Sequence, residues 1–229
     1  MRGELLGSSV EPGLSAMSLQ NPKMLRVDLD GEVIARQGAM VAYQGEIDFK
    51  YQGSGVKRLL KKMVTGEGLP LMRCEGSGRV FFAREARDIQ IIELEGESLT
   101  VNGDNVLAFE ATLDWDIRRV EGLGVFLGGV FNTVFTGYGA LAITCDGPPV
   151  VLDPTELPTY VDLGAAVAWT TSLRTSIRNT MGLGTLFGRG SGEKVQIGFS
   201  GEGFVVVQPS EGRGESWSSG NSGEEAEEN

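Results

Sequence analysis

The sequence contains few residue combinations that could carry out catalysis. No histidine occurs among its 229 residues, which removes the usual general base at neutral pH and the imidazole metal ligand. Four acids could in principle include a pair for acid–base chemistry, but such chemistry needs two carboxyl groups close together in space, which a sequence cannot establish: Asp114, Asp116, Asp153 and Asp162. We therefore expect no enzymatic activity and assign no catalytic residue.

The sequence also offers no convincing metal or cofactor site. Cys74 and Cys145 are too few for a disulfide framework or a four-ligand zinc site, so we expect two buried thiols. The acidic phrase at 28–32, DLDGE, lacks the remaining ligands of a calcium loop and is typical of a charged β-turn. Glycine-rich stretches at 122–128 and 182–192 have the spacing Gly-x-Gly-x-x-x-Gly and follow no βαβ pattern. We expect no bound metal and no cofactor.

A glycine phrase repeats three times at nearly even intervals. GSGRVFFA at 76–83, GYGALAIT at 137–144 and GEGFVVVQ at 201–208 each join a Gly-x-Gly to an apolar or β-branched run. Such a run is typical of a buried strand, and the glycines predict a turn or bulge that feeds it. The predicted structural turns are Gly76, Gly78, Gly137, Gly139, Gly201 and Gly203.

A second phrase follows the same period. Residues 31–49 align with 96–115, matching Gly31 with Gly96, Val41 with Val106 and Asp48 with Asp114, and a weaker third copy lies around 150–169. Units of this size cannot bury an apolar face alone, so we expect three of them to share one core. The sequence predicts an all-β protein: one β-sandwich or pseudo-barrel domain of three similar strand units, with one or two short helices in the connections.

The predicted domain has flanking segments at both ends. The units cover about 24–87, 88–147 and 148–208 within a domain at 18–208, preceded by an N-terminal extension at 1–17. Either Met1 or Met17 could be the start of the protein. Residues 209–229 are acidic and nearly free of aliphatic side chains, which predicts a disordered tail that could select a protein partner. The N-terminus lacks the apolar run of a secretory signal, so we expect a cytoplasmic protein.

Two connections between strands carry candidate contact surfaces. In the first, VKRLLKKM at 56–63 has helical amphipathic spacing and predicts a short helix capping the β-core. Its basic residues are solvated in that interpretation, or else form an anionic-partner patch or a membrane-surface contact: Lys57, Arg58, Lys61 and Lys62. The net charge of −11 disfavours nucleic acid as a partner.

The second connection is uncharged and apolar. Residues 122–145 contain no charged residue, a length that could span a membrane, but their many glycines, threonines and Asn132 argue against a span. An apolar patch of this size usually marks an association site, with ordinary core and lipid contact as the alternatives. The predicted oligomer interface comprises Val125, Phe126, Leu127, Val130, Phe131 and Phe135.

Several of these phrases together resemble one known family. GEVIARQGAMVAYQGEIDF at 31–49, GEG at 66–68, GSGRVFFA, VDLGAAVAW at 161–169 and GEGFVVVQ are similar to the altered inheritance of mitochondria protein 24 family, over about residues 18–208. The resemblance implies a single β-rich domain similar to the tryptophan RNA-binding attenuator protein fold, assembled as a ring-like homo-oligomer such as a trimer. It implies no enzymatic reaction and no catalytic residue for this chain.

These observations favour a non-enzymatic, oligomeric binding or scaffold protein. One alternative is a small-molecule or RNA-binding module, which rests on fold analogy alone. Another is a peripheral membrane protein that binds through the 56–63 helix.

Overall fold

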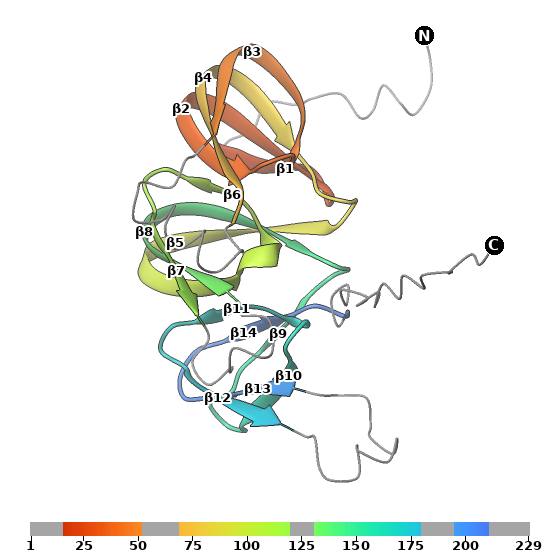
Figure 1. Ribbon diagram of the computed structural model, residues 1–229, viewed down its shortest axis with the longest axis vertical. Helices are drawn as coiled ribbons and strands as arrows, with labels where there is room; N and C mark the ends of the chain where they lie inside the picture. Colours follow the sequence, from red (N-terminus) through yellow and green to blue (C-terminus); the bar gives the residue numbers. More distant parts are fainter. Residues whose placement is uncertain (1–15, 52–68, 120–130, 180–194, 211–229) are drawn as a thin grey trace, which may run out of the picture.

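The computed structural model describes residues 16–51, 69–119, 131–179 and 195–210, and strands make up most of them (Figure 1). The strands are β1 (Met17–Asn21), β2 (Met24–Arg36), β3 (Met40–Tyr51), β4 (Leu71–Phe82), β5 (Asp88–Asn102), β6 (Val106–Glu110), β7 (Asp114–Arg119), β8 (Phe131–Cys145), β9 (Val150–Leu152), β10 (Thr159–Asp162), β11 (Ala166–Thr170), β12 (Arg174–Asn179), β13 (Val195–Ser200) and β14 (Val205–Val207). The described residues contain a single 3-10 turn, η2 (Gly103–Asn105), and no α-helix. The all-β prediction is confirmed; the helix expected at 56–63 lies outside the described residues.

The strands form two antiparallel sheets that do not close into a barrel. The larger sheet runs β3-β4-β2-β6-β8-β5-β11-β14-β9, with β1 added to β2 and β7 added to β8. The smaller sheet runs β10-β13-β12. Because β3 and β9 each end the main path, the pseudo-barrel alternative is wrong and the sheet is open. Figure 1 shows the strands arranged in three successive groups along the long axis of the molecule.

Each group is a unit with the same three-strand pairing. We call its strands A, B and C in chain order, where the C strand lies between A and B and pairs with both. The A strands are β2, β5 and the pair β9–β10; the B strands are β3, β6–β7 and β11–β12; the C strands are β4, β8 and β13–β14.

The B strand of every unit has a bulge at the same place. Its register against the C strand shifts between Met40 and Ala42, between Val106 and Ala108, and between Ala166 and Ala168. The phrases at these bulges are MVAY, VLAF and AVAW, at 40–43, 106–109 and 166–169. Val41 therefore corresponds to Leu107, and the alignment of Val41 with Val106 is wrong by one residue.

Neighbouring units are joined by one recurring strand pair. In the first joint, the A strand β2 pairs with the B strand β6 of the next unit through Val33↔Glu110, Ile34↔Phe109 and Ala35↔Ala108. In the second joint, β5 pairs with β11 through Leu99↔Thr170, Thr100↔Trp169 and Val101↔Ala168. Each joint thus uses the three B-strand residues that follow the bulge.

The core is divided into three clusters, one centred on each unit. The first is built around Leu25, Val80 and Phe82, the second around Phe109, Phe135 and Leu141, and the third around Trp169, Ile197 and Phe199. The expectation of one shared core is wrong in this respect, because each bent three-stranded unit encloses apolar side chains of its own. Residues from the second unit, such as Leu107 and Ala142, pack into the first cluster and connect the two.

The first two Gly-x-Gly pairs lie within strands instead of preceding them. Gly76 and Gly78 are in the middle of β4, and Gly137 and Gly139 are in the middle of β8; only Gly201 and Gly203 lie in a turn, between β13 and β14. At Gly78, φ is +152° and a Cβ would overlap the carbonyl oxygen of Gln44 on β3. Glycine therefore allows close backbone approach where the long C strand bends.

The acidic phrase at 28–32 also lies inside a strand, not in a β-turn. It forms part of β2, and Asp28 accepts a hydrogen bond from Arg79 Nε on β4 at 3.1 Å. Asp28 also pairs with Arg26 on its own strand. The hydrogen bond from Arg26 is the main cause that lowers the pKa of Asp28. Two acids of this phrase, Asp28 and Glu32, are therefore used in ion pairs across the sheet, with Arg79 and Arg73 of β4.

Candidate functional site

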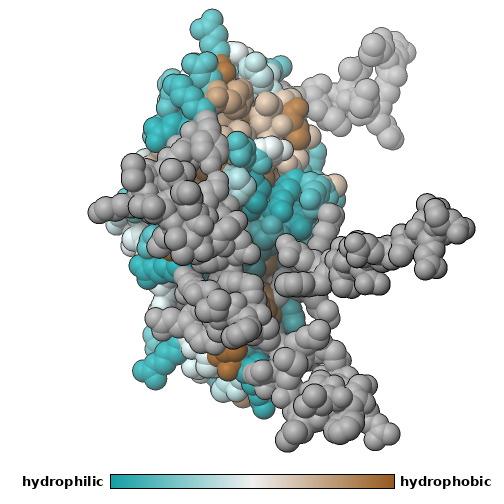
Figure 2. Space-filling view, viewed as in Figure 1, coloured by the Kyte–Doolittle hydropathy of each residue, from teal (hydrophilic) through white to brown (hydrophobic). Residues whose placement is uncertain are grey.

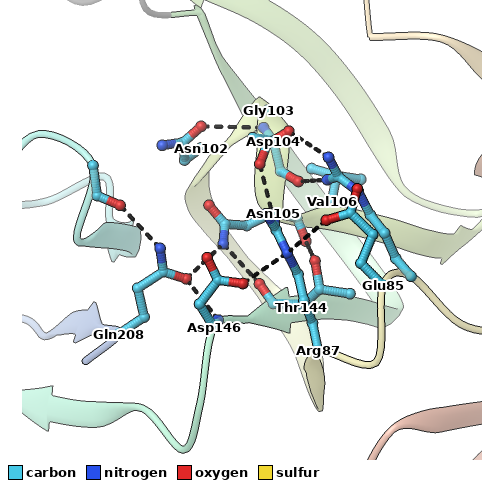
Figure 3. Close-up of polar contacts among 12 residues, drawn as sticks. Glu85, Arg87, Asn102, Gly103, Asp104, Asn105, Val106, Thr144, Asp146 and Gln208 are labelled. Atoms are coloured by element: carbon cyan, nitrogen blue, oxygen red, sulfur yellow. Dashed lines mark hydrogen bonds and ion pairs between the residues drawn. The ribbon is translucent and has the colours of Figure 1, made fainter. Parts of the chain in front are cut away.

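A buried polar cluster lies where the second and third units meet (Figure 3). Asn105, at the end of η2, donates through Nδ2 to the carbonyl oxygen of Thr144 at 2.7 Å and to Oε1 of Gln208 at 3.2 Å. Gln208 Oε1 also accepts from the backbone N–H of Asp146, and its Nε2 donates to the carbonyl oxygen of Gly164. All three side chains, Asn105, Thr144 and Gln208, are buried.

Arginine–carboxylate pairs extend this cluster towards the first unit. Arg87, just before β5, is almost fully buried and pairs with Asp146 at 2.8 Å and with Asp104 at 3.0 Å. Asp104 is also paired with Arg84 at 2.7 Å. Arg36, at the end of β2, donates to the carbonyl oxygens of Gly103 and Val106.

The electrostatics of this cluster are balanced. Burial opposes ionisation of Asp104, but the hydrogen bond and charge of Arg84, with help from Arg87, leave its pKa below the usual value. Burial, together with the nearby charge of Arg84, lowers the pKa of Arg36 to about 10, so that Arg36 remains charged at neutral pH. Three arginines thus face Asp104, Asp146 and Glu85, whose carboxylate lies 3.6 Å from Arg87. The cluster holds units together and has no surplus charge for an anionic ligand.

The cysteines and aspartates that could carry chemistry are engaged in structural roles. Burial raises the pKa of Cys74 to about 11, and burial with the charges of Asp88 and Asp146 raises that of Cys145 to about 12, so both are inert thiols. Both cysteines are buried and free, as predicted. Asp153 accepts from the N–H of Thr155, and Asp162 accepts from the N–H of Gly164.

Asp114 and Asp116 lie on β7, where Asp116 is 3.8 Å from Arg118. Within the residues that the structure describes, no three acidic or cysteine side chains gather as a metal site.

The sequence-predicted contact residues fall mostly outside the described residues. This holds for the basic patch, Lys57, Arg58, Lys61 and Lys62, and for the interface residues Val125, Phe126, Leu127 and Val130. Phe131 begins β8. Phe135 is fully buried between Phe109 and the rest of the second cluster, with ring centroids 4.9 Å apart. Its assignment to a subunit interface is wrong, because its side chain already belongs to the core of its own chain.

Two strand edges at opposite ends of the chain offer a different contact surface. In the described part of the chain, β3 pairs only with β4, and β10 pairs only with β13. Exposed apolar side chains lie on and beside these edges: Val41 and Tyr43 on β3, and Leu157 and Tyr160 at β10. Figure 2 shows hydrophobic surface over the β1–β4 group and a smaller area over the last group of strands.

Sequence reasoning missed these edge residues, although a signal was present. Tyr43, Phe109 and Trp169 are the aromatic residues of the three bulge phrases. Phe109 and Trp169 are buried at the two joints, whereas Tyr43 is exposed. Aligning the three phrases at their alanine–aromatic endings places Tyr43 at the position of Phe109 and Trp169. Unlike those two residues, Tyr43 lies in no joint between units of its own chain.

Comparisons with known proteins agree on the family and the fold. The family model described as mitochondrial biogenesis AIM24 matches residues 17–210. The chain is 32% identical over 110 residues to an uncharacterized protein of Streptococcus pyogenes serotype M6, a stretch that covers 46% of this chain and 42% of that protein. The match therefore spans less than half the length of that relative.

A crystal structure of a Streptococcus pyogenes protein, solved by a structural genomics consortium, is similar with a TM-score of 0.67. It has 24% sequence identity, and the similarity covers 84% of this chain and 91% of that one, which supports the fold alone. No helix in the described ranges is long and apolar enough to cross a membrane. Because the family model covers most of the sequence and agrees with the motifs quoted above, the chain belongs to the mitochondrial biogenesis AIM24 family.

Proposed function

We propose that the chain is a non-enzymatic, cytoplasmic protein that assembles with copies of itself into a binding scaffold, with three chains as the favoured number. The observation that carries this proposal is the pair of open strand edges, β3 and β10, each bearing an exposed tyrosine. Unpaired edges with apolar side chains are surfaces that natural proteins normally cover. A second copy of the same chain supplies both kinds of edge.

The chemistry of the described residues supports a binding role. Two buried thiols with raised pKa values are poor nucleophiles. The arginines of the unit junction are paired with carboxylates. The acidic residues 209–229 and the basic patch at 57–62 are proposed as contacts for protein partners once the scaffold has formed.

Light scattering during size-exclusion chromatography tests the proposed assembly. The full chain should elute, across a micromolar concentration series, with a mass that is a multiple of 24.5 kDa, three times that value for the favoured trimer. A mass of 24.5 kDa throughout the series would refute the scaffold proposal, because the chain would then not associate with a second copy through either edge.

A further inference from the structure

We propose that copies of the chain join head to tail, with β10 of one copy pairing antiparallel with β3 of the next. This inference rests on the proposed assembly and names its interface. The strand pair would repeat, between chains, the joint that already connects the units within one chain. The argument depends on three observations: the internal joints, the register of β10, and the exposure of the end residues.

The two internal joints define what a joint requires. Each one pairs an A strand with the B strand of the following unit, directly after the bulge. Within the described residues, β10, the A strand of the third unit, is joined to no further unit. In the same residues β3, the B strand of the first unit, has the same bulge and is likewise joined to no further unit. One chain therefore ends in the two complementary halves of a joint.

The register of β10 matches that of the joining A strands. In the first unit Val33 pairs with Cys74, two residues before Gly76; in the second unit Leu99 pairs with Phe135, two residues before Gly137. In the third unit Thr159 pairs with Phe199, two residues before Gly201. Thr159, Tyr160 and Val161 hence occupy the positions that make the internal joints.

Residues in the internal joints are buried, whereas the corresponding residues on β3 and β10 are exposed. On the B side, Phe109 and Trp169 are 0% and 5% exposed, whereas Tyr43 is 48% exposed. On the A side, Ile34 and Thr100 are 4% and 8% exposed, whereas Tyr160 is 49% exposed.

The alanine of the bulge phrase behaves in the same way. Ala108 and Ala168 are fully buried, and Ala42 is exposed. The end residues are thus of the type that a joint buries, in the positions where a joint would form.

The internal joints fix the expected register between copies. Thr159 would face Gln44 of the second copy, Tyr160 would face Tyr43 of the second copy, and Val161 would face Ala42 of the second copy. Directly opposed aromatic residues on neighbouring strands stabilise an antiparallel pair. Ala42 matches the alanines, Ala108 and Ala168, that occupy the corresponding position in the two internal joints.

The other strand edges correspond to edges that take no part in the two internal joints. Among the described residues, the strand partners of β7 and β12 are their C strands, as is that of the corresponding second half of β3. The apolar strand β9 corresponds to the first half of β5, which has only β8 as a strand partner within the described ranges. Because the joining edges differ from each other, the contact is heterologous and generates a closed ring or an open filament.

Two variants test the two strands of the proposed joint one at a time. Ala42→Glu places a charge on the β3 edge, and Tyr160→Lys places one on the β10 edge; both positions are exposed in the single chain, so the fold should be retained. The matched control is Val151→Lys, on β9, where the side chain is 65% exposed. Circular dichroism and a cooperative thermal transition establish that each variant is folded.

Light scattering of each variant, and of an equimolar mixture, gives the readout. Ala42→Glu and Tyr160→Lys should each self-associate at least about tenfold more weakly than the unsubstituted chain, because each would bury an unpaired charge. Val151→Lys should assemble normally. The mixture should form a complex of one chain of each variant, because it retains one intact β10 and one intact β3.

The outcomes distinguish this inference from the proposed assembly. An unsubstituted chain that is monomeric would defeat the assembly proposal itself. An oligomer that tolerates both end variants, or that is lost in Val151→Lys instead, would overturn the β10–β3 joint and leave the assembly proposal intact. If Ala42→Glu alone formed a dimer, the contact would be an edge pairing with itself, and the head-to-tail arrangement would be wrong.

Discussion

Asp104 is one of the residues through which the polar cluster connects the first two units. It lies in η2 of the second unit and pairs with Arg84 and Arg87, which follow the last strand of the first unit. Arg87 is buried, so its charge depends on these partners and on Asp146. Removing one carboxylate would leave a buried guanidinium partly uncompensated, which destabilises a folded protein.

Asp104→Asn should therefore lower the free energy of unfolding by about 1 kcal/mol at pH 7, a value kept small because the Asp104 side chain is more than half exposed to solvent. The folded-state pKa of Asp104 is lowered, so its contribution is present above the unfolded pKa and is lost as pH falls through the folded value. Urea titrations of both proteins should differ at pH 7 and converge at acidic pH, once Asp104 is protonated in the folded as well as the unfolded chain. The control Asp116→Asn, at an exposed pair, should change little; a loss equal to that of Asp104→Asn would contradict this role.

Individual residues could be predicted from the sequence only where their chemistry was decisive. The isolated cysteines were correctly expected to be buried thiols, because two cysteines without further ligands have few other uses. Phe135 was wrongly assigned to a subunit interface, because an uncharged run has the same composition in a core strand and in an exposed patch. Tyr43 was missed because the alignment of Val41 with Val106 placed it one residue away from the position of Phe109, and Tyr160 was missed because no repeated phrase marks its position.

Glycines and bulges give the strands their bends. In the first unit, Gly45 on β3 lies opposite Gly78, and Gly31 on β2 lies opposite Gly76, so glycines line up across the sheet. The absence of side chains there lets the sheet bend and enclose its own cluster. The bulges in the B strands then direct the following three residues towards the neighbouring unit.

Two glycine substitutions should separate backbone strain from steric overlap. At Gly31, φ is +127° and an added Cβ meets nothing within 4 Å, so Gly31→Ala should lower the free energy of unfolding by about 1–2 kcal/mol through strain alone. At Gly78 a Cβ would also overlap the backbone of β3, so Gly78→Ala should lose about 3 kcal/mol or more. Equal losses in urea unfolding would show that close strand approach at Gly78 is unimportant.

At the level of elements, the glycine period was visible in the sequence but its placement was not. The intervals between Gly76, Gly137 and Gly201 marked equivalent points of three C strands. A Gly-x-Gly before an apolar run usually indicates a turn, and here it marks a bend inside β4 and β8. The residue pattern of one strand cannot distinguish a turn before the strand from a bend inside it. The close backbone neighbour that requires a glycine lies on a different strand.

The described residues form a row of three units, and the strands β3 and β10 at its two ends each pair within this part of the chain with their own C strand alone. Each unit has its own apolar cluster, and each internal joint buries an aromatic residue of a B strand. The sequence indicated three units, but it could not show which strand joins one unit to the next. That information is carried by the pairing of β2 with β6 and of β5 with β11.

The register between copies can be measured directly with cysteine pairs. Tyr43→Cys and Tyr160→Cys variants, mixed and mildly oxidised, should form a disulfide-linked pair of chains, because directly opposed residues of antiparallel strands lie at a separation compatible with a disulfide. Cys74 and Cys145 are buried and should not compete. Mixing Tyr43→Cys with Val151→Cys provides the matched control. Covalent pairs in the first mixture and not in the control are expected; equal cross-linking in both, or none in the first, would contradict the head-to-tail joint.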